Sequence, residues 1–303
     1  MDNNFLALLT ANKLGTVLTG EPMSKHTSFH IGGPADILFI PNSAASLRKA
    51  LLLAANAAVP VTVIGNGTNL LVRDKGIRGM VIKLGNALCD YRVEEDSSLT
   101  FGSGLSLAFA AHVALETGLT GMEFAAGIPG SLGGAVYMNA GAYGGEMKDI
   151  VILVKVMDKK GKIKAFPVSE LAFGYRTSAL QAGDYMILAA TVKLQPGNKL
   201  DIQAKMDDLS LRRRTKQPLE MPSAGSTFKR PAGNFAGTLI ENAGLKGFSV
   251  GAAQVSTKHA GFIVNTGNAT CAQVLQLITA VQEKVYTFAG IHLEPEVLII
   301  GEK

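Results

Sequence analysis

Apolar and polar residues alternate in a pattern that predicts a small β-α-β domain over residues 1–85. Residues 35–41 alternate like a half-buried strand, and Ser43 is a suitable N-cap for an Ala- and Leu-rich helix through about residue 58. A β-branched run at 59–64 and an apolar stretch at 80–84 are typical of two further strands.

Strands dominate the pattern between residues 86 and 200. One helix is expected over residues 106–116, and Lys159-Lys160-Gly161 is a suitable turn for a hairpin. The predicted strands cover residues 91–95, 99–102, 150–158, 162–167 and 185–194. Pro196-Gly197-Asn198 then has the composition of a linker, so a domain boundary is expected near residue 200.

A third, mixed α/β domain is predicted over residues 201–303. A polar helix is expected to run to about Lys216 and to be followed by short strands. Two more helices are expected over residues 237–243 and 272–288, with a closing strand over residues 297–300.

Composition changes this picture mainly by excluding classes of protein. The 303 residues are 47% apolar and 17% charged, which suits globular cores and excludes a disordered chain. Aromatic residues make up 6% and Trp is absent, so no stacking platform for single-stranded nucleic acid is expected. The net charge of +5 suits an excess of surface Lys and a polyanionic small-molecule ligand equally well. The one dense basic run, residues 212–216, is a weak nucleic-acid signal.

The cysteines and the hydropathy of the chain indicate in which cellular compartment the protein is expected. Cys89 and Cys271 are far apart and have no Cys-x-x-Cys neighbour, so neither a disulfide framework nor a zinc site is expected. The first residues are polar, unlike a signal peptide, and no uninterrupted apolar run reaches about 18 residues. We therefore expect a cytoplasmic protein without a membrane span.

The segment Gly65-Asn66-Gly67-Thr68-Asn69-Leu70 directly follows a predicted strand and has the character of an anion-binding turn. Leu70 stands where a dinucleotide-binding fingerprint needs its third glycine, and residues 71–74 look extended rather than helical. The Walker lysine is missing, which excludes a P-loop. Two interpretations remain open: a nest of backbone N–H groups flanked by two Asn side chains, or a purely structural turn.

Glycine is concentrated between residues 125 and 145. Seven glycines lie from Gly127 to Gly145, and each costs roughly 0.5–1 kcal/mol relative to Ala in regular structure. An ordinary loop gains nothing from that density. A surface pressed against a flat cofactor and its pyrophosphate does gain, because side chains would block the approach, so we predict a ligand-binding role here.

Together with these two segments, four further motifs resemble the shorter form of the UDP-N-acetylenolpyruvoylglucosamine reductase family. They match it in order: Phe173-Gly174-Tyr175-Arg176-Thr177-Ser178, Gly225-Ser226-Thr227-Phe228-Lys229, Val255-Ser256-Thr257-Lys258-His259-Ala260-Gly261-Phe262 and Leu293-Glu294-Pro295-Glu296-Val297. The resemblance covers nearly the whole chain. It implies an α+β protein with a two-lobed FAD-binding domain of the PCMH/vanillyl-alcohol-oxidase type (residues 1–85 and 86–200) and a mixed α/β substrate domain (201–303).

The resemblance also implies FAD as the cofactor and NADPH as a co-substrate. The residues expected to bind FAD are Gly65, Asn66, Gly67, Thr68, Asn69, Leu70, Gly127, Ile128, Pro129, Gly130, Ser131, Gly133, Gly134, Ala135 and Arg213. Some relatives of this fold attach flavin covalently through a His or Cys beside the turn. Residues 65–70 contain neither, so non-covalent FAD is expected.

The implied reaction reduces UDP-N-acetylenolpyruvoylglucosamine to UDP-N-acetylmuramate, in the synthesis of peptidoglycan precursors. A hydride passes from NADPH to flavin N5 and then to the vinyl carbon of the substrate. Negative charge therefore develops on the adjacent carbon and its carboxylate. The site needs a cation at the carboxylate, a second polarising group and a proton donor.

Three residues of the matched motifs have the chemistry for these roles. Arg176 can pair with the carboxylate in bidentate geometry, and Glu296 would polarise it as a second partner. Ser226 would protonate the charged carbon, assisted by its surroundings because a serine hydroxyl is a poor acid in water. Without the family resemblance, each residue also has a structural explanation. Arg176 could bridge a strand end to the surface, Glu296 could be a surface strand residue, and Ser226 could be a turn residue.

The basic residues acquire roles in the same scheme. Lys216 and Lys229 are expected to bind the UDP-sugar, and His259 either packs beside the substrate or is structural. Nucleic acid is then not an expected partner, and a monomer is the default. Two alternative functions stay open: an FAD-dependent oxidase or dehydrogenase of the same fold, and a non-catalytic nucleotide-sugar binding protein.

Overall fold

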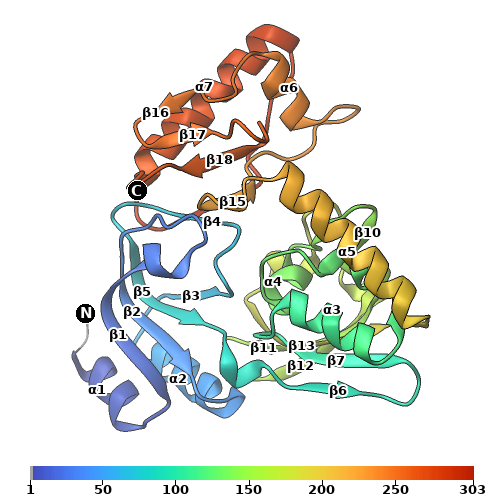
Figure 1. Ribbon diagram of the computed structural model, residues 1–303. Helices are drawn as coiled ribbons and strands as arrows, with labels where there is room; N and C mark the ends of the chain where they lie inside the picture. The colour runs from blue at the N-terminus through green and yellow to red at the C-terminus, as the bar shows by residue number, and fades with distance from the viewer. Residues whose placement is uncertain (1–2) are drawn as a thin grey trace. The chain divides into compact units, whose positions relative to one another are not determined.

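The computed structural model describes residues 3–303, which divide into two compact units (Figure 1). Unit 1 comprises the chain up to Thr19, Ile37–Asn66 and Gly79–Arg212. Unit 2 comprises Gly20–Asp36, Gly67–Arg78 and Arg213–Lys303. The chain therefore passes between the units five times, once at each junction between these six segments.

Most of a four-stranded sheet, in the order β1-β2-β5-β3, belongs to unit 1. Its strands are β1 (Gly15–Pro22), β2 (Pro34–Pro41), β5 (Ile77–Lys83) and β3 (Val61–Ile64). Helices α1 (Asn3–Ala11) and α2 (Ala44–Asn56) pack on it through a core that includes Phe39, Leu47 and Met80. Ser43 caps α2, because its hydroxyl oxygen accepts a hydrogen bond from the Ser46 N–H (3.0 Å).

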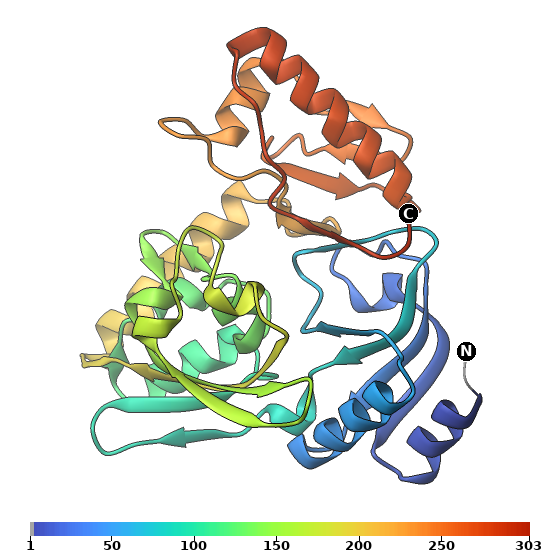
Figure 2. The same ribbon diagram turned by 180° about the vertical axis from the view of Figure 1, so that it is seen from behind.

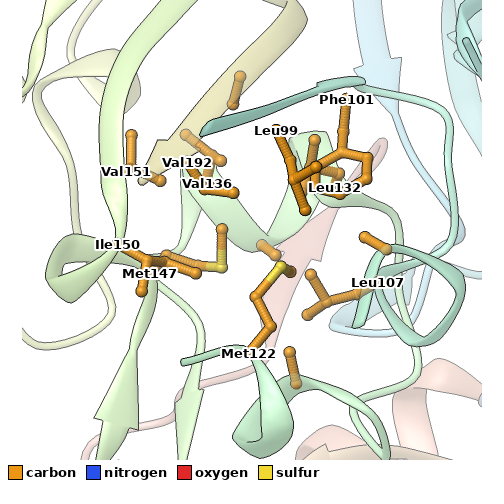
Figure 3. Packing of buried hydrophobic residues seen from close by; sticks show 14 of the residues in the cluster. Leu99, Phe101, Leu107, Met122, Leu132, Val136, Met147, Ile150, Val151 and Val192 are labelled. Carbon is orange, nitrogen blue, oxygen red and sulfur yellow. The ribbon is translucent and has the colours of Figure 1, made fainter. Parts of the chain in front are cut away.

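A five-stranded antiparallel sheet, in the order β12-β11-β13-β7-β6, forms the rest of unit 1. Its strands are β12 (Ile163–Pro167), β11 (Val151–Asp158), β13 (Tyr185–Lys193), β7 (Ser98–Gly102) and β6 (Tyr91–Val93). Helices α3 (Leu107–Glu116) and α4 (Leu132–Tyr137) pack on this sheet. In the core between them, Leu107, Leu132 and Val136 lie against the strand residues Leu99 and Val192 (Figure 3).

Unit 2 contains a four-stranded antiparallel sheet in the order β15-β18-β17-β16. Its strands are β15 (Ser223–Ser226), β18 (Phe262–Asn265), β17 (Ala253–Val255) and β16 (Ser249–Val250). Helices α6 (Ala236–Asn242) and α7 (Cys271–Ala289) pack on it (Figure 2), and α7 presents Val274, Leu277 and Val281 to the core. A separate parallel pair joins β4 (Leu70–Val72) to β19 (Leu298–Ile300).

The remaining elements are short, apart from the helix α5 (Lys199–Lys216), which leads from unit 1 into unit 2. The short strands are β8 (Leu119–Thr120), β9 (Gly141–Ala142), β10 (Gly145–Glu146) and β14 (Gln195–Pro196). None of the helices within residues 3–303 combines the length and the apolar character that crossing a membrane requires.

The predicted strands and helices with a clear pattern are confirmed, with ends shifted by up to three residues. The absence of a helix after the Gly65–Leu70 turn is also confirmed, since β4 follows directly. The patterns do not predict α1, β1 or α4. The last of these begins inside the glycine-rich segment, where two glycines give a low helix propensity.

Candidate functional site

The turn after β3 and the glycine-rich segment lie against each other within unit 1. A Cβ atom at Gly65 would collide with the Ser131 hydroxyl oxygen, so a larger residue would have to displace the hydroxyl that caps α4. Gly133 is restricted similarly, because its Cβ would lie 2.9 Å from the Cβ of Ser103. Packing within the protein is sufficient to explain both glycines. Glycine density is therefore weaker evidence for a ligand than the sequence suggested.

The two segments differ in whether their backbone N–H groups already donate hydrogen bonds within the protein. In the glycine-rich segment, the amides of residues 132–135 all donate hydrogen bonds to acceptors of the protein, and Ser131 caps α4 by accepting from the Gly134 N–H (3.3 Å). In the turn, no hydrogen bond among the described residues uses the amides of residues 66–68 as donors. The turn therefore has backbone donors of the kind that bind a pyrophosphate.

A loop without a distinctive sequence motif, around Ser28, supports the turn within unit 2. A Cβ at Gly67, whose φ is +67°, would collide with the His26 carbonyl oxygen. The Ser28 N–H donates to the Gly67 carbonyl (3.2 Å), and the Ser28 hydroxyl donates to the Ser223 carbonyl (2.6 Å). Ser28 thus connects the turn to β15. Its only local sequence signal is a short polar run, which is typical of any loop.

Arg176 lies at the tip of a tight turn in unit 1. Gly174 and Thr177 exchange two backbone hydrogen bonds (3.1 and 3.3 Å), which leaves Tyr175 and Arg176 as the turn residues. Arg176 has a φ of +56°, an uncommon conformation for a residue with a side chain. Its guanidinium donates to the Gly141 carbonyl (3.3 Å) and lies 5.2 Å from the centroid of the Tyr175 ring.

Buried polar groups fix the Arg176 turn on the glycine-rich segment. Asn139 is fully buried, and its amide donates to the Gly174 carbonyl (2.9 Å) and to the Glu146 carboxylate (2.7 Å). The Ser178 hydroxyl donates to the Tyr137 carbonyl at the end of α4 (2.8 Å). Because buried polar groups are satisfied by such bonds, the turn has few alternative positions. Arg176 and the glycine-rich segment are therefore neighbours within unit 1.

Ser226 and Glu296 lie on adjacent segments of unit 2. Ser226 is the last residue of β15 and is exposed, whereas the following Thr227 is buried. The Glu296 N–H donates to the Thr227 carbonyl (2.8 Å), and the Lys229 N–H donates to the Glu294 carbonyl (2.8 Å). Residues 227–229 and 294–296 therefore run antiparallel. Two of the three predicted catalytic residues are brought together in this way.

Asn69 connects the predicted cofactor turn to the same pair of segments. Its side-chain amide donates to the Glu296 carbonyl (3.2 Å), and its own carbonyl accepts from the Leu298 N–H (2.9 Å). Both contacts lie within unit 2 and continue into the parallel β4–β19 pair.

The basic residues expected to bind substrate or cofactor have different environments. Lys216 is exposed at the end of α5. Lys229 forms an ion pair with Glu294 (3.1 Å), in which both side chains are largely exposed, and such a pair contributes little to stability. Arg213 is buried, which is unusual for a residue type that is almost never fully buried without compensation.

His259 has the environment of a structural histidine. Burial lowers its pKa, which favours the neutral ring, and its Nδ1 accepts a hydrogen bond from the Gly261 N–H (3.1 Å). The ring also packs edge-on against Phe262, with 5.1 Å between centroids. Of the two interpretations of His259, these contacts favour the structural one.

The predicted site residues are thus distributed over both units. Unit 1 holds Gly65, Asn66, the segment 127–135 and Arg176. Unit 2 holds Gly67–Leu70, Arg213, Lys216, Ser226, Lys229 and Glu296. The structure brings Arg176 to the glycine-rich segment in one unit, and Asn69, Ser226 and Glu296 together in the other.

Comparison with known proteins defines the class first. Residues 35–166 match the FAD binding domain family, so the chain is a flavoprotein with the α+β fold described above. Residues 217–300 match the C-terminal domain of UDP-N-acetylenolpyruvoylglucosamine reductase. The chain is also 51% identical to the UDP-N-acetylenolpyruvoylglucosamine reductase of Caldanaerobacter subterraneus subsp. tengcongensis, over 96% of each chain. It belongs to the UDP-N-acetylenolpyruvoylglucosamine reductase family.

Other similarities agree with this assignment. The reductase of the same name from Clostridioides difficile is 47% identical over 98% of each chain. Among solved structures, that of UDP-N-acetylenolpyruvylglucosamine reductase from Thermus caldophilus has a TM-score of 0.81 and 35% identity, covering 94% of this chain and 98% of that one. The predicted family and fold class are confirmed.

Proposed function

We propose that this protein reduces UDP-N-acetylenolpyruvoylglucosamine to UDP-N-acetylmuramate, with NADPH as the reductant and FAD as a non-covalently bound cofactor. The observation that carries the proposal is the 51% identity, over 96% of both chains, to a relative named as this reductase. The two family matches support it, because they supply an FAD-binding part and a reductase-specific part. The product would enter peptidoglycan synthesis and so cell-wall formation.

The residues present fit FAD. The turn offers backbone N–H groups for the pyrophosphate, and the glycine-rich segment lies against it without side chains at Gly133 and Gly134. We assign FAD binding to residues 65–70, to Gly127, Ile128, Pro129, Gly130, Ser131, Gly133, Gly134 and Ala135, and to Arg213. When bound, FAD would carry reducing equivalents from NADPH to the vinyl carbon of the substrate.

Arg176 is proposed to bind the substrate carboxylate. A guanidinium stays charged and can donate two parallel hydrogen bonds to a carboxylate, which would stabilise the negative charge that grows there. The bonds from Asn139 and Ser178 support this role, because they hold the Arg176 turn in place before substrate arrives. Glu296 is proposed to polarise the same carboxylate.

Ser226 is proposed to give its hydroxyl proton to the carbon next to the reduced one. Its exposed position at the end of β15 supports this role, because the hydroxyl must reach a bound substrate. Lys216 and Lys229 are proposed to contact the UDP-sugar, whose diphosphate attracts ammonium groups.

The test is a comparison of the two half-reactions in the wild-type protein and Ser226→Ala. In the wild type, NADPH should bleach the yellow flavin, and UDP-N-acetylenolpyruvoylglucosamine should restore the colour. Ser226→Ala should still be bleached by NADPH but should form no product, a loss of at least about 100-fold for a general acid. Normal turnover of Ser226→Ala would remove Ser226 from the mechanism, and a wild type that ignores the enolpyruvyl substrate would overturn the proposed function.

We propose a cytoplasmic monomer, which the absence of a membrane-spanning helix within residues 3–303 permits. We also propose two FAD-binding subdomains, residues 1–85 and 86–200, and a substrate domain over residues 201–303. The family matches at 35–166 and 217–300 support a boundary near residue 200.

A further inference from the structure

We infer that the side chain of Asn69 is a positioning residue for Glu296, so that the cofactor turn itself sets the place of the proposed carboxylate-polarising group. This inference rests on the proposed role of Glu296 and deepens it. It also gives the two parts of Asn69 different roles. The backbone would bind FAD, and the side chain would position Glu296.

The backbone of Glu296 forms hydrogen bonds through both its N–H and its carbonyl group. Its N–H donates to the Thr227 carbonyl (2.8 Å), and its carbonyl accepts from the Asn69 amide (3.2 Å). One anchor is therefore the residue after Ser226, and the other is in the predicted pyrophosphate turn. Both contacts lie within unit 2. The backbone of Glu296 is therefore fixed on both sides of its Cα atom.

Each anchor is itself fixed. Thr227 is buried, and its hydroxyl oxygen accepts from the Ile263 N–H (3.0 Å) in the middle of β18. Asn69 is followed directly by β4, and its carbonyl accepts from the Leu298 N–H (2.9 Å), two residues beyond Glu296. Asn69 thus binds the chain on either side of Val297, through its side chain and its backbone.

The amide group explains why Asn stands at this position. A carbonyl acceptor needs a donor, and Asn supplies one on a short side chain that loses little conformational freedom. Asp would present an oxygen to the Glu296 carbonyl, and Ala would present nothing. The side chain of Asn69 is therefore engaged by the protein, so its expected contribution to FAD affinity is small.

The test uses the full-length FAD-loaded protein with Asn69→Asp and Asn69→Ala. Asp keeps the size of Asn but removes the donor, and Ala removes the donor without adding charge beside the pyrophosphate. The control is Leu71→Val, which loses packing in the same β4 strand, where Leu71 is fully buried, but leaves the bond to Glu296 in place.

Three quantities are measured: the rate of flavin reduction by NADPH, the rate of flavin reoxidation by UDP-N-acetylenolpyruvoylglucosamine, and the dissociation constant of FAD. We expect reoxidation to slow by about tenfold or more in Asn69→Ala, the order expected for one lost hydrogen bond. Flavin reduction and the FAD dissociation constant should change by less than about threefold, and Leu71→Val should slow neither half-reaction selectively. If FAD affinity falls in step with reoxidation, Asn69 is a cofactor ligand and the inference is wrong.

Amide hydrogen exchange supplies a readout that does not depend on activity. In Asn69→Ala and Asn69→Asp, exchange of the amides at Glu296 and Leu298 should accelerate by about tenfold, while the β15–β18 amides keep their wild-type rates. Unchanged exchange at Glu296 would overturn the inference. If the wild-type flavin is not reoxidised by the enolpyruvyl substrate, the proposed function fails, but the exchange result still decides whether Asn69 positions Glu296.

Discussion

Arg176 adopts a left-handed backbone conformation, with a φ of +56°, in the turn that the buried Asn139 holds in place. For a residue with a Cβ atom this conformation is strained by about 1–3 kcal/mol. Glycine would adopt it without strain, yet arginine occupies the position. Such local strain is typical of residues retained for binding or catalysis rather than for stability.

Replacing Arg176 separates the backbone strain from the side-chain role. Arg176→Gly and Arg176→Ala both remove the guanidinium, so both should lose most of the reductase activity. Arg176→Gly should be more stable than Arg176→Ala by about 1 kcal/mol, because only glycine is free of the left-handed penalty. Urea unfolding of the two variants measures this difference. Equal stabilities would mean that the positive φ carries no strain.

His259 makes the stability of the protein depend on pH. Burial is the main cause of the lowered pKa of the folded histidine, and the charge of Lys246 adds to it, while a backbone hydrogen bond and the charge of Glu241 act in the opposite direction. The unfolded chain therefore binds a proton as the pH falls through about 6.5, before the folded chain does. The contribution of His259 to stability is thus fully present above about pH 6.5 and is lost as the pH falls toward the lowered pKa.

A non-titrating variant tests this dependence. His259→Asn keeps an acceptor for the Gly261 N–H but cannot gain a proton in this range. The wild type should lose more unfolding free energy than His259→Asn when the pH is lowered from about 7.5 to about 5. Parallel stability curves for the two proteins would show that His259 is not responsible.

At the scale of secondary-structure elements, sequence patterns predict most of the helices and strands that depend on local interactions. The helix that Ser43 caps and the strand at residues 185–193 follow directly from capping and alternation. Helix α4 does not, because its two glycines oppose helix formation. Its stability comes from the Ser131 cap and from the burial of Leu132 and Val136 in a core formed with distant strands.

The candidate site is predictable residue by residue but not in its arrangement. Arg176, Ser226 and Glu296 can be named from their motifs, and the turn at Gly65–Leu70 from its composition. The bond from Asn69 to Glu296 joins residues 227 positions apart in the chain, and no local pattern encodes such a pairing. The hydrogen bonds of Ser28 cannot be predicted from local sequence either, because its partners Gly67 and Ser223 belong to other segments.

The start of helix α7 depends on a residue from the segment after the turn. The Asp74 carboxylate accepts hydrogen bonds from the Cys271 and Ala272 N–H groups (2.8 and 2.9 Å), which are otherwise unpaired at a helix N-terminus. Asp74→Ala should destabilise the protein by about 1–2 kcal/mol, whereas Asp74→Asn should lose less because one oxygen acceptor remains.

Thermal unfolding of the two Asp74 variants, read alongside amide exchange in α7, measures this effect. Exchange should accelerate at the first turn of α7 in Asp74→Ala. Wild-type exchange there would show that Thr270 and Gln273, which form a capping box, are sufficient.

At the scale of the whole molecule, the way in which FAD is attached to the chain is open to a direct test. FAD should be held by non-covalent contacts, since residues 65–70 contain no His or Cys. Denaturation by acid or heat should therefore release all the flavin into the supernatant after the protein is removed. Flavin that stays with the denatured chain would contradict non-covalent binding.

The five passages of the chain between the units have a consequence for how the protein is made. During synthesis, β4 leaves the ribosome long before its parallel partner β19, and residues 20–36 must wait for β15. Unit 2 therefore cannot fold in step with translation, although unit 1 can assemble most of its sheets earlier. Its early segments stay without their partners until β19 is made, so we expect unit 2 to be the part of the chain that chaperones protect during synthesis.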